Sequence, residues 1–168
     1  MRRTMVVLLT GAAVVGVGTV AVAADSTLLA HLSSDDEVPA NDSLAVGNAV
    51  FHLSDDETEL EYKLIVANIH NVVAAHIHLG PEGVNGPVVA FLYGPAAPGG
   101  GRTQGVIGRG TITAANLTGP LTGQPMSALV SAISDGNAYV NVHTNDGVPS
   151  TPAGPGDLPA GEIRGQMD

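Results

Sequence analysis

The sequence predicts a small all-β domain, an antiparallel β-sandwich or barrel with one short helix. Three observations support this fold class. Apolar and polar residues alternate along many short segments, clusters of turn-forming residues separate those segments, and a single segment has the spacing of an amphipathic helix.

The clearest alternating segment is 60–66, where Leu60, Tyr62, Leu64 and Val66 lie on one face of an extended chain. A period of two is typical of a strand with one buried face. Seven further segments show similar alternation, at 27–32, 45–53, 74–79, 88–93, 106–112, 138–144 and 162–167. Turn-forming residues lie between them at 54–57, 80–83, 85–87 and 134–137.

The expected helix covers residues 125–133. Proline at its start and Met126, Leu129, Val130 and Ile133 on one face indicate a short amphipathic helix between two strands. Two glycine- and proline-rich stretches, 94–105 and 145–161, are expected to be surface loops.

The N-terminus predicts export from the cytoplasm. Arg2 and Arg3 precede an uncharged apolar run, 5–23, that ends in Ala-Val-Ala, which is the pattern of a secretory signal peptide. We expect cleavage after residue 23, with an uncleaved membrane anchor as the alternative. Residues 24–168 would then form one domain located outside the cell, in the periplasm or at the cell surface.

Removal of residues 1–23 would leave four basic residues against all 16 acidic ones, a net charge of about −12. This balance disfavours nucleic acid and anionic membranes as partners, because both require a positive surface. An extracellular or periplasmic partner, a cation or a basic surface remains compatible. The absence of cysteine excludes disulfides and thiolate sites.

The histidines give the most specific functional hypothesis. His76 and His78 are two residues apart in an expected strand whose core residues are Ile77 and Leu79, so both imidazoles should project from the opposite face. Parity likewise turns Tyr139, Asn141 and His143 of 138–144 outward. If the two strands are neighbours, His76, His78 and His143 could share a copper or zinc ion. His52 is a further candidate by parity, whereas His31 and His70 read as surface residues.

The competing interpretation is structural. The paired histidines would fix the loop 80–86 by hydrogen bonds, and His143 would support the strand containing Glu162 and Arg164. These last two residues share a strand face and are expected to pair with each other or across strands. The acidic clusters 35–37 and 55–57 lack the spacing of a calcium loop and are expected to be solvated turns.

Three segments in this order, AHIHLGPEGVNGPVV, AYVNVHT and PAGEIRGQ, resemble the CHRD domain, a family named after chordin that includes many bacterial exported proteins. The resemblance runs from about residue 27 to 167. It implies an immunoglobulin-like β-barrel with limited similarity to copper/zinc superoxide dismutases, and it supplies no settled biochemical function. The segment 145–158 departs from the family pattern as an insertion.

The sequence therefore predicts a secreted binding or structural module, with a copper- or zinc-binding protein as the alternative. Catalysis is not expected, because no hydrolase or phosphate-binding motif occurs. Superoxide dismutase activity is disfavoured by the lack of cysteine and of any histidine between His78 and His143. A metal-dependent enzyme built on the same three histidines is a weaker third hypothesis.

Overall fold

The computed structural model describes residues 26–149 and 153–168, so the expected signal peptide, 1–23, lies outside the described residues. Eight strands form one antiparallel sheet, accompanied by one α-helix and two short 3-10 helices. The strands are β1 (Ser26–Ser33), β2 (Val46–Leu53), β3 (Glu59–His70), β4 (Val72–Leu79), β5 (Val88–Tyr93), β6 (Arg102–Thr113), β7 (Ala138–Thr144) and β8 (Ile163–Gln166). The helices are η1 (Ala114–Asn116), η2 (Gly119–Leu121) and α1 (Met126–Ser134).

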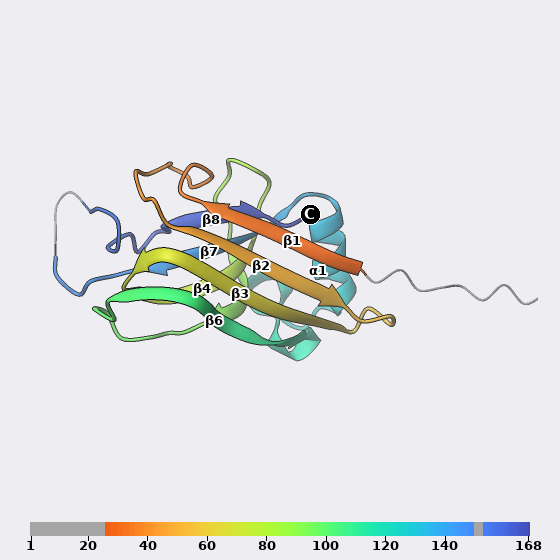
Figure 1. Cartoon of the computed structure of the whole chain (residues 1–168). Coiled ribbons are helices and arrows are strands. Elements are labelled where there is room, and N and C mark those ends of the chain that lie inside the picture. The colour runs from red at the N-terminus through yellow and green to blue at the C-terminus, as the bar shows by residue number, and fades with distance from the viewer. Residues whose placement is uncertain (1–25, 150–152) are drawn as a thin grey trace, which may run out of the picture.

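The sheet has the strand order β5-β4-β7-β8-β1-β2-β3-β6 and rolls into a nearly closed barrel (Figure 1). Strands β1, β2, β3 and β6 form the near wall in that view, and β8, β7 and β4 lie behind them. The Tyr62 hydroxyl of β3 donates a hydrogen bond of 2.9 Å to the Leu92 carbonyl, which links the edge strand β5 to the strand beside the other edge, β6. Because the sheet curls on itself, few backbone N–H and C=O groups are left unpaired at exposed strand edges.

The barrel interior is filled by the apolar residues that the alternation selects. Leu60, Leu64 and Val66 of β3 are buried, as are Ile77 of β4 and Val140 of β7. The helix α1 buries Met126, Leu129 and Ile133 against this core. It starts directly after Pro125, so both the helix and its buried face confirm the sequence prediction.

The all-β prediction is confirmed, and of the two architectures considered the described residues adopt the barrel-like form. The expected loop 94–105 is wrong at its end, because β6 begins at Arg102. Thr103 pairs with Ile69 and Arg102 with His70, which extends β3 as well. This part of β6, residues 102–105, is polar and largely exposed, so it carries no alternating signal.

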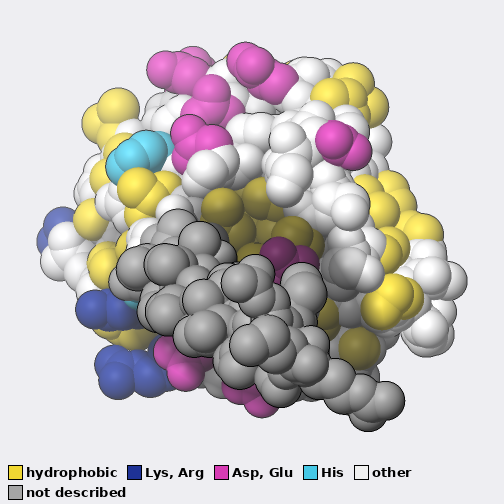
Figure 2. Space-filling model, turned by 90° about the vertical axis from the view of Figure 1, so that its right-hand side faces the viewer, with side chains coloured by type: hydrophobic (Ala, Val, Ile, Leu, Met, Phe, Trp, Pro, Cys, Tyr) yellow, Lys and Arg dark blue, Asp and Glu magenta, His cyan; other side chains and the backbone are white. Residues whose placement is uncertain are grey.

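Figure 2 shows the distribution of charge on one face. Acidic side chains form several separate groups there, whereas the Lys and Arg side chains lie along the left side of the view. None of the helices within the described residues is long and apolar enough to cross a membrane.

Candidate metal centre

The antiparallel pairing of β4 with β7 brings the three predicted histidines together. In this register His76 lies opposite Asn141 and His78 opposite Tyr139. His143 lies opposite Ala74, which is two residues before His76 on β4. All three imidazoles therefore emerge from the same face of neighbouring strands. One ring nitrogen from each lies within 4.8 Å of those of the other two.

The hydrogen bonds of the rings define which nitrogens carry protons. His78 donates from Nδ1 to the Gly86 carbonyl at 2.9 Å, and His143 donates from Nδ1 to the Pro159 carbonyl at 3.1 Å. Because a carbonyl only accepts, both rings must bear their proton on Nδ1 and a lone pair on Nε2. A ligand histidine in a metal site is usually held in this way, with its second nitrogen donating to a carbonyl or carboxylate.

The two Nε2 atoms differ in their surroundings. That of His143 lies 3.1 Å from Nδ1 of His76, which donates a hydrogen bond to it. That of His78 is buried and has no hydrogen-bond partner among the described residues. The residue as a whole is 8% exposed. His78 therefore has a buried lone pair on Nε2 that no other described residue uses.

The environment keeps these rings neutral. Burial, together with the adjacent His143 and His78, lowers the pKa of His76 to about 4. Burial likewise lowers the pKa of His143 to about 4, against a raising contribution from the bond to Pro159. The pKa of His78 is also lowered, mainly by burial. Neutral imidazoles offer lone pairs to a metal at neutral pH.

The ring positions approach those of a metal site. Two nitrogens on a tetrahedral ion with bonds of 2.0–2.1 Å lie roughly 3.3 Å apart. The His76–His143 nitrogen pair, at 3.1 Å, already has this spacing. The ring centroid of His78 lies 5.6 Å from that of His76 and 5.9 Å from that of His143, so the third ring lies beside this pair.

A second layer of side chains positions His78. Its ring stacks on Tyr139, with centroids 4.9 Å apart and an interplanar angle of 14°. The Tyr139 hydroxyl accepts a hydrogen bond of 3.0 Å from the Gly86 amide, while the carbonyl of the same glycine holds His78. A Cβ at Gly86 would collide with the Leu79 carbonyl, so only glycine allows this close approach.

The expectation that this face of β7 points to solvent is wrong. Tyr139 is only 1% exposed and Asn141 only 2%. The loops 34–45, 80–87 and 153–162 cover the face, and the first two are joined by a bond from the Asn85 amide to the Val38 carbonyl. Strand parity correctly separates the two faces of the sheet, but it cannot show that loops bury the second one.

His52 does not join the cluster. It is exposed on β2, where its Nδ1 lies 3.1 Å from the Thr27 hydroxyl. His31 and His70 are likewise exposed, as the sequence predicted. The three-histidine set is therefore His76, His78 and His143, the residues that the spacing singled out.

Sequence reasoning missed Glu37. The cluster 35–37 was expected to be solvated, but Glu37 is only 6% exposed. Its two carboxylate oxygens accept hydrogen bonds from the Asn141 side-chain nitrogen at 2.9 and 3.1 Å. Burial raises the pKa of Glu37 to about 7, although its bond to Asn141 and the nearby Arg164 oppose the shift. The second cluster, 55–57, is an exposed turn as predicted.

Glu162 and Arg164 are expected to pair with each other or across strands, and for Glu162 the described residues show the second alternative, with Thr144 of β7. Buried Glu162 accepts bonds from the Ser43 hydroxyl at 2.6 Å, the Thr144 hydroxyl at 2.5 Å and the Gly156 amide at 2.8 Å. Glu162 immediately precedes β8, and its side chain ties two loops to the end of β7. The carboxylate of Glu162 therefore acts as a hydrogen-bond acceptor that holds the loops in place.

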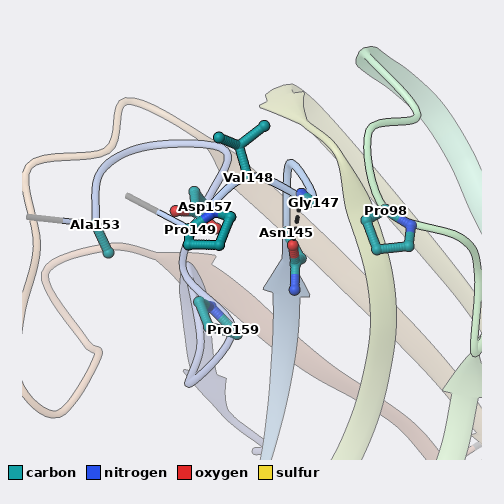
Figure 3. A pocket seen from close by; sticks show the side chains of 8 residues that line it. All are labelled: Pro98, Asn145, Gly147, Val148, Pro149, Ala153, Asp157 and Pro159. Carbon is teal, nitrogen blue, oxygen red and sulfur yellow. Dashed lines mark hydrogen bonds between the residues drawn. The ribbon is translucent and has the colours of Figure 1, made fainter. Parts of the chain in front are cut away.

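The loop that holds His143 also borders a cavity of about 390 Å³ (Figure 3). Asn145, at the end of β7, accepts a hydrogen bond of 2.7 Å from the Gly147 amide, and Pro98 lies across from them. The lining is mostly proline, glycine and aliphatic side chains: Pro98, Asn145, Gly147, Val148, Pro149, Ala153, Asp157 and Pro159. Among the described residues of this lining, only Asp157 has an ionisable side chain, so the cavity offers fewer groups for binding or catalysis than the histidine cluster does.

Comparison with known proteins assigns the chain to a family. The family model of the CHRD domain matches residues 28–167, which includes every strand from β2 to β8 and nearly all of β1. Searches among curated proteins and solved structures gave no significant match. The match spans nearly the whole chain and contains all three histidines, so this protein belongs to the CHRD domain family.

Proposed function

We propose that this protein is an exported metal-binding protein that holds a copper or zinc ion with His76, His78 and His143. The single observation that carries the proposal is the Nε2 atom of His78, which is buried without a partner among the described residues. The ring of His78 belongs to a cluster in which one nitrogen from each of the three imidazoles lies within 4.8 Å of those of the other two.

The structural role of the histidines does not account for this arrangement. The bonds that fix the loops use Nδ1 of His78 and Nδ1 of His143, as the competing hypothesis expected in part. They do not use the Nε2 atoms. That of His143 accepts a hydrogen bond from His76, and that of His78 has no partner among the described residues. A buried acceptor without a donor costs about 1–3 kcal/mol. A cation would recover that cost, and His76 would carry its proton on Nε2 instead of Nδ1.

The donor set favours copper or zinc. Imidazole nitrogens suit both ions, and the cluster contains neither thiolate nor carboxylate. Three protein ligands also leave a coordination position available for another group. Calcium and magnesium are disfavoured because they require oxygen ligands.

Binding rather than catalysis is the role we propose, because no motif for a nucleophile or a general base accompanies the cluster in the sequence. Export is supported by the N-terminal pattern of residues 1–23 and by the occurrence of CHRD domains in extracellular proteins. The partner would then be a metal ion, or an extracellular or periplasmic molecule, with neither nucleic acid nor a membrane beyond the signal segment.

Calorimetric titration tests the proposal directly. The full chain is expressed with its own leader, the exported protein is purified and stripped with a chelator, and Zn²⁺ and Cu²⁺ are added separately. We expect one ion per chain, with binding at least 100-fold weaker in His78→Ala and His143→Ala. His52→Ala serves as the matched control because it removes an exposed histidine from another strand.

An absence of binding at micromolar metal would overturn the metal proposal, as would equal losses in all three variants. Mass spectrometry of the same preparation tests export. A chain beginning at residue 24 supports the leader assignment, and an intact N-terminus in the membrane fraction contradicts it.

A further inference from the structure

Asn141 lies at the base of the histidine cluster. It is opposite His76 in the β4–β7 register, two residues before His143 on the same face, and diagonal to His78, which pairs with Tyr139. Residues directly opposite in an antiparallel pair have Cβ atoms about 4.5–5.5 Å apart, and diagonal ones about 7–8 Å. All three imidazoles are therefore same-face neighbours of this one amide.

The amide has a defined orientation. Its nitrogen donates to both oxygens of Glu37. While Glu37 is ionised, turning the amide over would place its oxygen against two acceptors. Gly161 leaves room for the pair: a Cβ there would lie 2.6 Å from the Asn141 nitrogen and 2.7 Å from each Glu37 oxygen. The side-chain oxygen of Asn141 is consequently directed away from the carboxylate.

That oxygen is buried and has no hydrogen-bond partner among the described residues. The same holds for Nε2 of His78, the lone pair discussed above. Both atoms are acceptors, so they cannot satisfy each other. Among the described residues only one other buried side-chain atom, Oε1 of Gln166 on β8, has no partner. His78 and Asn141 share one face of the β4–β7 pair, so a single donor or cation in contact with both would satisfy them.

We propose that the Asn141 side-chain oxygen is the fourth donor of the three-histidine site and binds the metal ion. This inference rests on the proposed function and extends it to the class of ion. A site of three imidazole nitrogens and one amide oxygen suits a divalent ion, because Cu(I) prefers soft ligands and gains little from a carbonyl oxygen. The site therefore selects Zn²⁺ or Cu²⁺ over Cu⁺.

The first test replaces the oxygen by an apolar side chain of similar size. Asn141→Leu should weaken Zn²⁺ binding at least tenfold and change the g values of the Cu²⁺ electron paramagnetic resonance spectrum. Its affinity for Cu⁺, measured by competition with a chromogenic chelator, should stay within threefold of the original protein. Equal losses for Zn²⁺ and Cu⁺, or an unchanged Cu²⁺ spectrum, would overturn the inference.

A second variant keeps the Glu37–Asn141 hydrogen bond and remains informative if Asn141→Leu does not fold. In the double variant Glu37→Gln, Asn141→Asp, the donor and the acceptor of that pair exchange places, while position 141 gains a charged oxygen. We expect Zn²⁺ binding at least as tight as in the original protein.

Zn²⁺ binding that is tenfold weaker in this double variant, with a native melting transition, would contradict a ligand role for position 141. These outcomes are separable from failure of the proposed function. If the proposed function fails, the unmodified protein itself binds no metal, and no loss of affinity can be measured in the variants.

Discussion

The guanidinium carbon of Arg164 lies 3.5 Å from the centre of the Tyr139 ring, and both side chains are almost fully buried. Arg164 is on β8 and His78 on β4, the strands that flank β7 in the sheet. Tyr139, on β7, thus contacts a cation from one neighbouring strand and an imidazole of the proposed metal centre from the other. The C-terminal strand supports the site through this ring.

Arg164→Lys is expected to lower the free energy of unfolding by about 2 kcal/mol. The planar guanidinium covers the ring and donates to the Pro81 carbonyl at 2.9 Å, and a lysine ammonium cannot reproduce both contacts. Urea denaturation measures the loss. Arg109→Lys, at an exposed position of β6, is the control, and an equal change in the two variants would contradict the prediction.

Gly161→Ala should destabilise the protein by about 1–3 kcal/mol. The added Cβ would press on Asn141 and Glu37, and the glycine has φ of 147°, which other residues rarely adopt. Gly154→Ala is the matched control in the same loop, because a Cβ there meets nothing within 4 Å. Thermal unfolding of the two variants should separate them clearly. Similar melting temperatures would show that the loop moves aside.

Glu37→Gln should change how stability depends on pH. The pKa of Glu37 is raised from 4.5 to about 7 in the folded protein, so the folded state binds this proton more tightly than the unfolded state does. The stabilisation is complete below pH 4.5 and is lost as the pH rises through about 7.

Relative to the original protein, the variant should therefore gain stability between pH 4.5 and 7, by at most about 3 kcal/mol, and remain level above that range. Denaturant unfolding of both proteins at each pH isolates Glu37, because the other titrating groups cancel in the difference. A difference that does not vary with pH would disprove the raised pKa.

Glu162→Gln should cost about 2–3 kcal/mol. The carboxylate accepts hydrogen bonds from Ser43, Thr144 and Gly156, and an amide nitrogen in place of one oxygen would face a donor instead. Hydrogen exchange should show faster opening at Gly156. Glu59→Gln, at an exposed position of β3, is the control and should leave both stability and exchange unchanged.

Metal removal should lower the melting temperature. A ligand that binds only the folded state stabilises it by about 2.7 kcal/mol at a free concentration 100 times its Kd. Zinc should therefore raise the melting temperature of the original protein, and a chelator should reverse the change. In His78→Ala the zinc-dependent shift should disappear, and a shift that persists would place the ion elsewhere.

The sequence alone determined the elements of this fold. Period-two alternation located all eight strands, and the spacing of Met126, Leu129 and Ile133 located the helix, because burial against a single core imposes these local patterns. The same parity placed His76, His78 and His143 on one face. That their strands are neighbours was an assumption until the β4–β7 register was known.

Only the tertiary structure decided what covers that face. Glu37 precedes Asn141 by 104 positions, and nothing in its acidic cluster distinguishes it from its solvated neighbours Asp35 and Asp36. The burial of Glu37 and Asn141 comes from loops folding over the outside of the sheet, and loop packing follows no period along the chain. Alternation reports only which side of a strand faces the core, so a second, polar interior assembled from distant loops leaves no local trace.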